Sequence, residues 1–154
     1  MTKVDFYLLG AGHNSQALFA CRLAEKVWRL GHRVYLLTAD QPAANELDDL
    51  LWTFSPGSFV PHALCKQEED ADHHADNHPV LIGHAEPPAS LSDVLISLSA
   101  DVPAWFSRFT RVVEMVGASE DDKTRARERF RFYRERGYPL ETHNLSDVPG
   151  RRQR

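Results

Sequence analysis

This sequence has few cysteines and no long apolar segment. Its two cysteines, Cys21 and Cys65, are too few for a disulfide framework, so we expect a reducing, cytoplasmic environment. No apolar run approaches the roughly 18–20 residues that a transmembrane helix requires. The opening residues, MTKVDFYLLGAG, reach glycine and then histidine too early for the apolar core of a signal peptide.

Motifs of several enzyme classes are also missing. The chain has no P-loop, no Gly-x-Ser-x-Gly nucleophile elbow and no His-Glu-x-x-His zinc motif. Cys21 lies on the apolar face of a predicted helix, and no catalytic signature surrounds Cys65. We therefore expect no catalytic residue and no enzyme activity in the chain itself.

A partial dinucleotide fingerprint stands near the start of the chain. Gly10-x-Gly12 follows a predicted strand, but Ser15 replaces the third glycine of the fingerprint. Asp40 stands where an acidic residue could contact a ribose, and it could equally cap a helix. A tight strand-to-helix turn explains the glycines without a cofactor, so we expect none. A nucleotide-dependent enzyme that uses these residues is the less favoured alternative.

Histidines and one cysteine gather in the middle of the chain. Imidazole and thiolate groups are zinc ligands, but the spacing here matches no standard zinc motif. Solvated loop residues explain the cluster more simply, so we expect no metal site. The residues considered are His62, Cys65, His73, His74, His78 and His84.

What is present is a globular composition, with 42% hydrophobic and 26% charged residues. Strand-like apolar runs alternate with segments of helical periodicity, which indicates an α/β fold with a mainly parallel sheet and helical crossovers. The expected strands lie at residues 3–9, 33–38, 80–84, 94–98 and 109–116. Helices are expected from a cap at Asn14 or Ser15 to Gly31, from a cap at Asp40 to Phe54, at residues 103–107, and from a Ser119–Asp122 capping box to Arg136.

We assign residues 1–145 to a single domain. Within it, residues 66–79 are polar, acidic and rich in histidine, and we expect them to form a mobile surface loop. Residues 146–154 are predicted to be a disordered basic tail.

Charge is divided unevenly along the chain. Residues 1–122 carry 8 Lys/Arg against 18 Asp/Glu, whereas residues 123–154 carry 10 against 4. An acidic body repels a phosphate backbone, which excludes a protein that coats nucleic acid with its whole surface. A local basic patch remains compatible with this charge.

Four cations form a stripe along the last predicted helix. On a projection of about 100° per residue they fall within an arc of about 80°, beside Phe130. A merely solvated helix does not require such a stripe, so we infer that it binds a ligand. The four cations are Lys123, Arg127, Arg131 and Arg134. Three further arginines, Arg125, Arg129 and Arg136, are predicted to point away from it.

Two ligand classes fit this stripe. Arginine side chains suit phosphate oxygens, and Phe132 could stack on a base. An acidic peptide with a hydrophobic end would instead place carboxylates on the cations and its apolar side chain beside Phe130. The acidic remainder of the chain favours the peptide, and direct nucleic-acid binding stays as an alternative.

Trp52 and Phe59 form a second candidate surface. Trp52 lies about 140° from Leu47 on its predicted helix, outside the apolar face. With Phe59 it could form an exposed patch for a partner protein, or the turn-rich segment 55–62 could fold back over the indole.

Taken together, the sequence resembles the DNA polymerase III chi subunit family, whose members are accessory proteins of the bacterial clamp-loader complex. The resemblance covers nearly all of residues 3–143. Its pieces are FYLL at 6–9, Leu47-Asp48 and Leu51-Trp52, SFVPH at 58–62, LISL at 95–98, FTRVV at 109–113, and ARERF at 126–130 before Tyr133-Arg134.

The resemblance implies a Rossmann-like three-layer fold without a cofactor, and a non-catalytic role in DNA replication. Members bind the acidic, Phe-terminated tail of single-stranded DNA-binding protein, which connects the replicase to the coated template. Arg127 would grip the terminal carboxylate, Lys123 and Arg131 would meet aspartates, and Val116 and Phe130 would hold the final ring. Phe130 stands where a tyrosine is common in the family.

The resemblance also implies a second surface, which docks the psi subunit of the clamp-loader complex or a competing accessory helicase. The matching positions in this sequence are Trp52 and Phe59.

Overall fold

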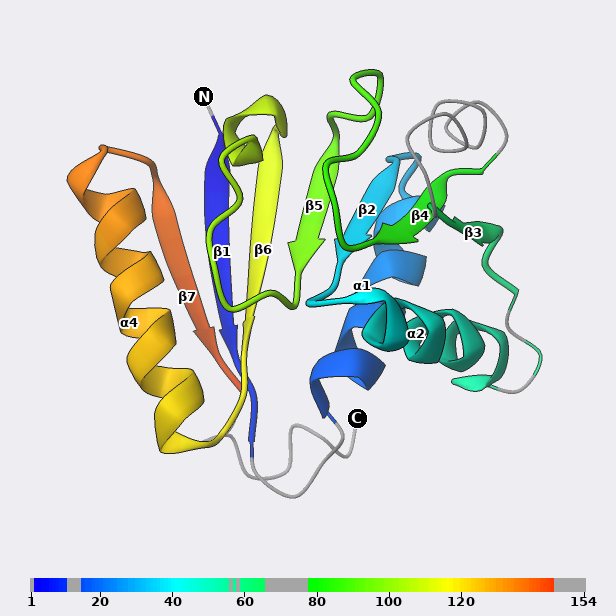
Figure 1. Ribbon diagram of the computed structural model, residues 1–154, viewed down its shortest axis with the longest axis horizontal. Helices are drawn as coiled ribbons and strands as arrows, with labels where there is room; N and C mark the ends of the chain where they lie inside the picture. Colours follow the sequence, from blue (N-terminus) through cyan, green and yellow to red (C-terminus); the bar gives the residue numbers. More distant parts are fainter. Residues whose placement is uncertain (1, 11–14, 56, 58, 66–77, 146–154) are drawn as a thin grey trace.

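The computed structural model describes residues 2–10, 15–55, 57, 59–65 and 78–145 (Figure 1). No helix in these ranges is both long and apolar enough to span a membrane. The elements, in chain order, are β1 (Lys3–Leu8), α1 (Ser15–Arg29), β2 (Val34–Leu37), α2 (Gln41–Thr53), β3 (His62–Leu64), β4 (Val80–Gly83), β5 (Val94–Ser97), a 3₁₀ turn (Phe106–Arg108), β6 (Arg111–Val116), α4 (Glu120–Glu135) and β7 (Leu140–Asn144).

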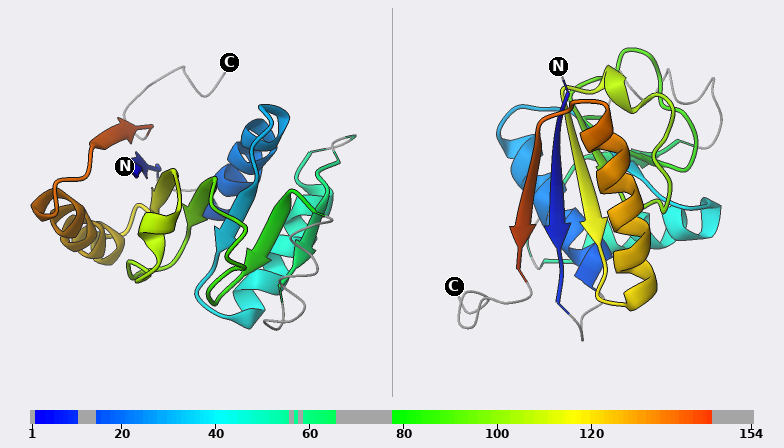
Figure 2. Two further views of the ribbon diagram at one scale, coloured as in Figure 1. Left: turned by 90° about the horizontal axis from the view of Figure 1, so that it is seen from above. Right: turned by 90° about the vertical axis from the view of Figure 1, so that its left-hand side faces the viewer.

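In the described part of the chain, seven strands form one sheet in the order β3-β4-β2-β5-β6-β1-β7. Every neighbouring pair is parallel. Helices α1 and α2 cover one face of the sheet and α4 covers the other, as Figures 1 and 2 show. The predicted three-layer α/β fold with a parallel sheet is therefore confirmed.

Side-chain alternation along the central strands builds a core on each side of the sheet. In β2, Val34 and Leu36 pack with residues of α1 and α2. Tyr35 and Leu37, which alternate with them, belong to the cluster under α4 and the 3₁₀ turn. Both faces are covered, which explains why the central strands are apolar throughout.

Two predicted helix caps are present. Asp40 Oδ1 accepts a hydrogen bond of 2.9 Å from the Ala43 N–H at the start of α2. Ser119 Oγ accepts one of 3.0 Å from the Asp122 N–H at the start of α4. Beyond the C-terminus of α4, Gly137 adopts a φ of 82°, a conformation that glycine allows at little cost.

Strands β3 and β7 were not predicted. Both lie at an edge of the sheet, and β7 reads LETHN, without the apolar pattern of a buried strand. The helix predicted at 103–107 is instead a 3₁₀ turn at Phe106–Arg108, and the strand predicted from residue 109 begins at Arg111. The predicted tail at 146–154 and most of the predicted loop, residues 66–77, lie outside the described residues.

Candidate functional site

The chain leaves the adjacent strands β1 and β6 toward opposite faces of the sheet. After β1 the chain crosses one face of the sheet through α1 to reach β2, and after β6 it crosses the other face through α4 to reach β7. In open parallel sheets, ligands bind outside the carboxyl ends of the strands at such a switch point. A pocket of about 530 Å³ opens there, beside α4.

Four segments line this pocket. The carboxyl ends of β1 and β6 form its floor, the first three turns of α4 form one wall, and the edge strand β7 forms the other. Four of the five residues predicted for tail binding belong to the lining, and Arg131 does not. The full lining consists of Phe6, Leu8, Leu9, Gly10, Val116, Gly117, Ala118, Lys123, Ala126, Arg127, Phe130, Thr142 and Asn144.

The floor of the pocket is apolar and firmly packed. Val116 is buried, and the half-buried Phe130 ring packs edge-on against Phe6, with the ring centroids 5.3 Å apart. Phe6 also contacts the buried Tyr133 ring at 6.0 Å. An aromatic or aliphatic group that entered the pocket would meet preformed apolar surface.

The rim of the pocket is basic. Lys123 and Arg127 are exposed, and Lys123 Nζ lies 3.9 Å from the exposed Glu120 carboxylate. Arg127 donates a hydrogen bond of 3.4 Å to the Thr124 hydroxyl. Within the described residues, neither Arg127 nor Arg131 pairs with a carboxylate, so both guanidinium groups can bind an external anion.

Arg129 belongs to a buried polar network that the sequence analysis did not predict. The projection placed Arg129 away from the cation stripe, and there its side chain is buried and donates a hydrogen bond from Nε to Glu114 Oε1 at 2.9 Å. The Tyr133 hydroxyl donates to Glu114 Oε2 at 2.7 Å, and Arg129 Nη1 donates to the Ala100 carbonyl at 3.0 Å. This network ties α4 to β6 and to the segment after β5.

Burial raises the pKa of the Glu114 carboxyl, and Arg129 and the Tyr133 hydroxyl act in the opposite direction. Burial, together with the adjacent carboxylate, raises the pKa of Tyr133 and keeps it a hydrogen-bond donor. A glutamate within the apolar run RVVEMV was the sequence signal for this network, because a charge in a buried strand requires a partner.

Trp52 and Phe59 lie together on the surface. Trp52 is 53% exposed and Phe59 is 59% exposed, and their ring centroids are 5.7 Å apart. The Trp52 ring also lies 4.6 Å from the imidazole of the buried His62. The described part of segment 55–62 therefore leaves the indole accessible instead of covering it.

Beneath this patch, His62 is held by local contacts. Its Nδ1 lies 2.6 Å from the Val60 carbonyl oxygen, and its Nε2 lies 3.2 Å from Asp48 Oδ1. His84 Nε2 lies 3.2 Å from Gln41 Oε1. Neither histidine belongs to a metal-type cluster within the described residues, and His73 and His74 lie outside them.

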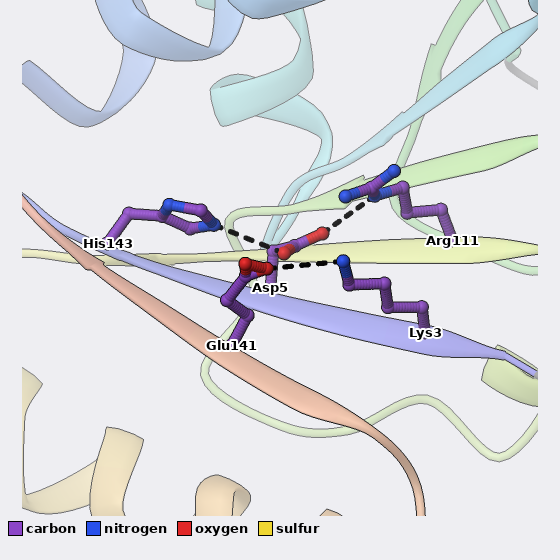
Figure 3. A network of polar contacts seen from close by, with 5 residues as sticks. All are labelled: Lys3, Asp5, Arg111, Glu141 and His143. Carbon is purple, nitrogen blue, oxygen red and sulfur yellow. Dashed lines mark hydrogen bonds and ion pairs between the residues drawn. The ribbon is translucent and has the colours of Figure 1, made fainter.

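A different polar cluster occupies the sheet face opposite α4 (Figure 3). Asp5, Glu141 and His143 offer ligand-type atoms within 4.8 Å of one another. Arg111 Nε lies 2.7 Å from Asp5, however, and Lys3 Nζ lies 3.2 Å from Glu141. Since each carboxylate already pairs with a cation, we interpret the cluster as an ion-pair network.

The remaining residues considered for catalysis or cofactor binding are buried, cap a helix, line the pocket or lie outside the described residues. Burial raises the pKa of Cys21 to about 12, which removes its thiolate at neutral pH. The Asp40 carboxylate caps α2, as described above. Gly10 lines the pocket, whereas Gly12 lies outside the described residues. The first turn of α4 carries Glu120, Asp121 and Asp122, which disfavours a phosphate at that helix terminus.

Comparison with known proteins places the chain in a family. A family model described as DNA polymerase III chi subunit, HolC, matches residues 1–141. A Pseudomonas aeruginosa protein named DNA polymerase III subunit chi is 44% identical over 149 residues, which cover 96% of this chain and 100% of that protein. The Escherichia coli protein of the same name is 34% identical over 148 residues, covering 92% and 97%.

The fold is shared more widely. A solved structure titled "The crystal structure of T4 UvsW" superposes with a TM-score of 0.67 at 8% identity, covering 96% of this chain and 42% of that chain. This likeness concerns the fold alone. The family model matches residues 1–141, and the two relatives named DNA polymerase III subunit chi match this chain over nearly their whole length. This chain therefore belongs to the DNA polymerase III chi subunit family.

Proposed function

We propose that this chain binds the acidic, Phe-terminated C-terminal tail of single-stranded DNA-binding protein, and so links the DNA polymerase III clamp loader to coated single-stranded DNA. The observation that carries the proposal is the pocket at the switch point, where an apolar floor adjoins a basic rim. A peptide that ends in an aromatic residue presents an apolar ring and a carboxylate at the same position. The pocket complements both groups.

Each predicted residue has a distinct task in this proposal. Arg127 grips the terminal carboxylate, since a guanidinium group can donate two parallel hydrogen bonds to it. Val116 on the pocket floor and Phe130 on the α4 wall contact the terminal ring. Arg131 binds an aspartate that precedes the ring, from outside the pocket lining, whereas Lys123 stands one helical turn before Arg127 and adds positive charge at the carboxylate end of the tail.

The proposed role is that of a non-catalytic adaptor, with polymerase activity residing in other subunits. The pocket lining combines apolar side chains with two cations, Lys123 and Arg127, and two neutral polar residues, Thr142 and Asn144. Such a set holds an anion with an apolar end and is poorly suited to proton transfer.

The exposed Trp52–Phe59 patch is proposed as the docking surface for the psi subunit, or for an accessory helicase that competes with it. Paired exposed aromatic rings are typical anchors at protein interfaces. The proposal predicts that a Trp52→Ala variant loses psi in co-purification, while its binding to single-stranded DNA-binding protein is unchanged. Loss of both interactions would contradict separate surfaces.

The alternative is direct binding of single-stranded DNA by the exposed arginines of α4. Arg127 and Arg131 favour it, because they have no carboxylate partner within the described residues. Both functions weaken with salt, so salt dependence does not separate them.

The test compares immobilised single-stranded DNA coated with intact or tail-deleted single-stranded DNA-binding protein, together with bare DNA. The adaptor proposal predicts binding to the first surface and loss of binding to the second. Equal binding to all three surfaces would replace it with direct nucleic-acid binding.

A further inference from the structure

The cation stripe of α4 extends beyond the pocket. Lys123 and Arg127 line the pocket, but Arg131 and Arg134 stand further along the helix and do not. Arg134 is exposed, and its side chain pairs with no carboxylate in the part of the chain that the structure describes. The residues assigned above to tail binding do not include Arg134, so this cation has no role yet.

Arg134 lies on the pocket side of α4. The opposite side is fixed by Arg129, which reaches Glu114 on β6 and the Ala100 carbonyl after β5. Arg134 falls about 140° from Arg129 in helical projection but only about 20° from Arg127. It therefore continues the helix edge that faces β7, whose Thr142 lines the pocket.

The charge along α4 also gives a bound acidic peptide a direction. The first turn carries Glu120, Asp121 and Asp122, which repel an acidic chain. The opposite direction passes Arg131 and Arg134. A tail anchored by its carboxylate at Arg127 is therefore guided from the pocket toward the C-terminal end of the helix.

Helix and strand dimensions then define which tail residue meets Arg134. Arg134 follows Arg127 by seven residues, a rise of about 10 Å along the helix axis at roughly 1.5 Å per residue. An extended peptide covers that distance in about three residues at roughly 3.3 Å each. The matching tail residue is the third before the terminal one.

We propose that Arg134 is a specificity-determining residue of the tail site and selects peptides with an acidic side chain about three positions before the C-terminal residue. The proposal rests on the tail-binding function proposed above. The pocket alone recognises only the C-terminal residue of the peptide. Arg134 extends recognition to a residue further back and defines the direction in which the peptide runs along α4.

The experiment is a calorimetric double-mutant cycle. Two peptides, Asp-Asp-Ile-Pro-Phe and Asp-Asn-Ile-Pro-Phe, differ only at the third position before the terminal residue. Each is titrated into the wild type, Arg134→Ala, Arg134→Lys and the control Arg125→Ala. Arg125 is a suitable control because it lies on the other side of α4, with its Nε 3.3 Å from Asp121.

The wild type is expected to bind the acidic peptide about two- to fivefold more tightly than the neutral one, as suits an exposed ion pair. Arg134→Ala removes this preference, whereas Arg134→Lys and Arg125→Ala keep most of it. A preference that persists in Arg134→Ala overturns the inference while tail binding stands. If neither peptide binds the wild type, the proposed function fails and this inference fails with it.

Discussion

At the scale of single residues, the buried network of Glu114, Arg129 and Tyr133 is the most sensitive point of the fold. The side chain of Glu114 is fully buried and that of Arg129 is 8% exposed. Arg129→Ala leaves an unpaired carboxylate in the core and is expected to lower the free energy of unfolding by about 3–5 kcal/mol. Urea unfolding at neutral pH measures this loss.

Arg125→Ala is the matched control for that substitution. Its partner Asp121 is exposed, and such pairs contribute at most about 1 kcal/mol. Equal destabilisation by the two substitutions would contradict the structural role assigned to Arg129.

Asp5 makes stability depend on pH. Burial alone would raise the pKa of Asp5, but hydrogen bonds with Arg111 and His143 outweigh it and hold the pKa below the usual 3.8. A carboxylate with a lowered pKa in the folded state stabilises the protein above its unfolded-state pKa. That contribution decreases as the pH falls below about 3.8 and is lost below the folded-state pKa.

The stability difference between the wild type and Asp5→Asn should therefore be largest near neutral pH and shrink in acid below about pH 3.8. Unfolding free energies measured across this range test the prediction. A difference that grows on acidification would show that the pKa is shifted in the opposite direction.

At the scale of elements, α4 has two chemically different sides. Its inner side carries Ala126, Arg129 and Tyr133, and its pocket edge carries Lys123 and Arg127. These two sides therefore serve different purposes, since one is packed against the sheet and the other lines the pocket.

The Ser119 cap fixes the first turn of α4, which precedes both sides. Ser119→Ala is expected to lower the free energy of unfolding by about 1 kcal/mol, and a thermal unfolding series measures this loss. No change at all would mean that the cap contributes nothing to α4.

Sequence periodicity predicted the central elements well, because strands such as β2 and β5 are buried on both faces and helices such as α4 have a clear start signal. The edge strand β7 has no comparable signal, since its polar side chains are compatible with a loop. As a result Thr142 and Asn144, which form one wall of the pocket, could not be predicted.

The α4 side of the candidate site could be predicted from helical periodicity alone. The helical projection brought Lys123, Arg127 and Phe130 to one edge without knowledge of the sheet. It placed Arg129 away from this edge but did not indicate that the side chain is buried, because a binary apolar pattern treats every arginine as exterior. Only the position of Glu114 on the neighbouring strand shows that Arg129 belongs to the core.

At the scale of the whole molecule, the two candidate surfaces lie toward opposite edges of the sheet. The pocket is bounded by β7, whereas the Trp52–Phe59 patch belongs to α2 and the segment before β3, and β3 and β7 are the two edge strands. Figure 1 shows α2 and α4 at opposite ends of the molecule. This separation allows two partners to bind at once.

Sites this far apart without shared contacts are expected to act additively. A Trp52→Ala, Phe59→Ala double variant should bind the tail peptide with wild-type affinity, and Arg127→Ala should bind psi as the wild type does. Size-exclusion chromatography of chain, psi and tail-containing partner should show one ternary complex. Mutual displacement of the two partners would contradict independent sites.

We propose above that the pocket beside α4 binds a carboxylate-terminated acidic peptide. Calorimetric titration of Asp-Asp-Ile-Pro-Phe into the wild type and Arg127→Ala tests this binding. We predict saturable binding with one site per chain in the wild type, and a loss of affinity of at least about tenfold in the variant, as expected when a charge-assisted pair is removed. Wild-type affinity in Arg127→Ala, or no binding to the folded wild type, would show that this pocket is not the binding site of the tail.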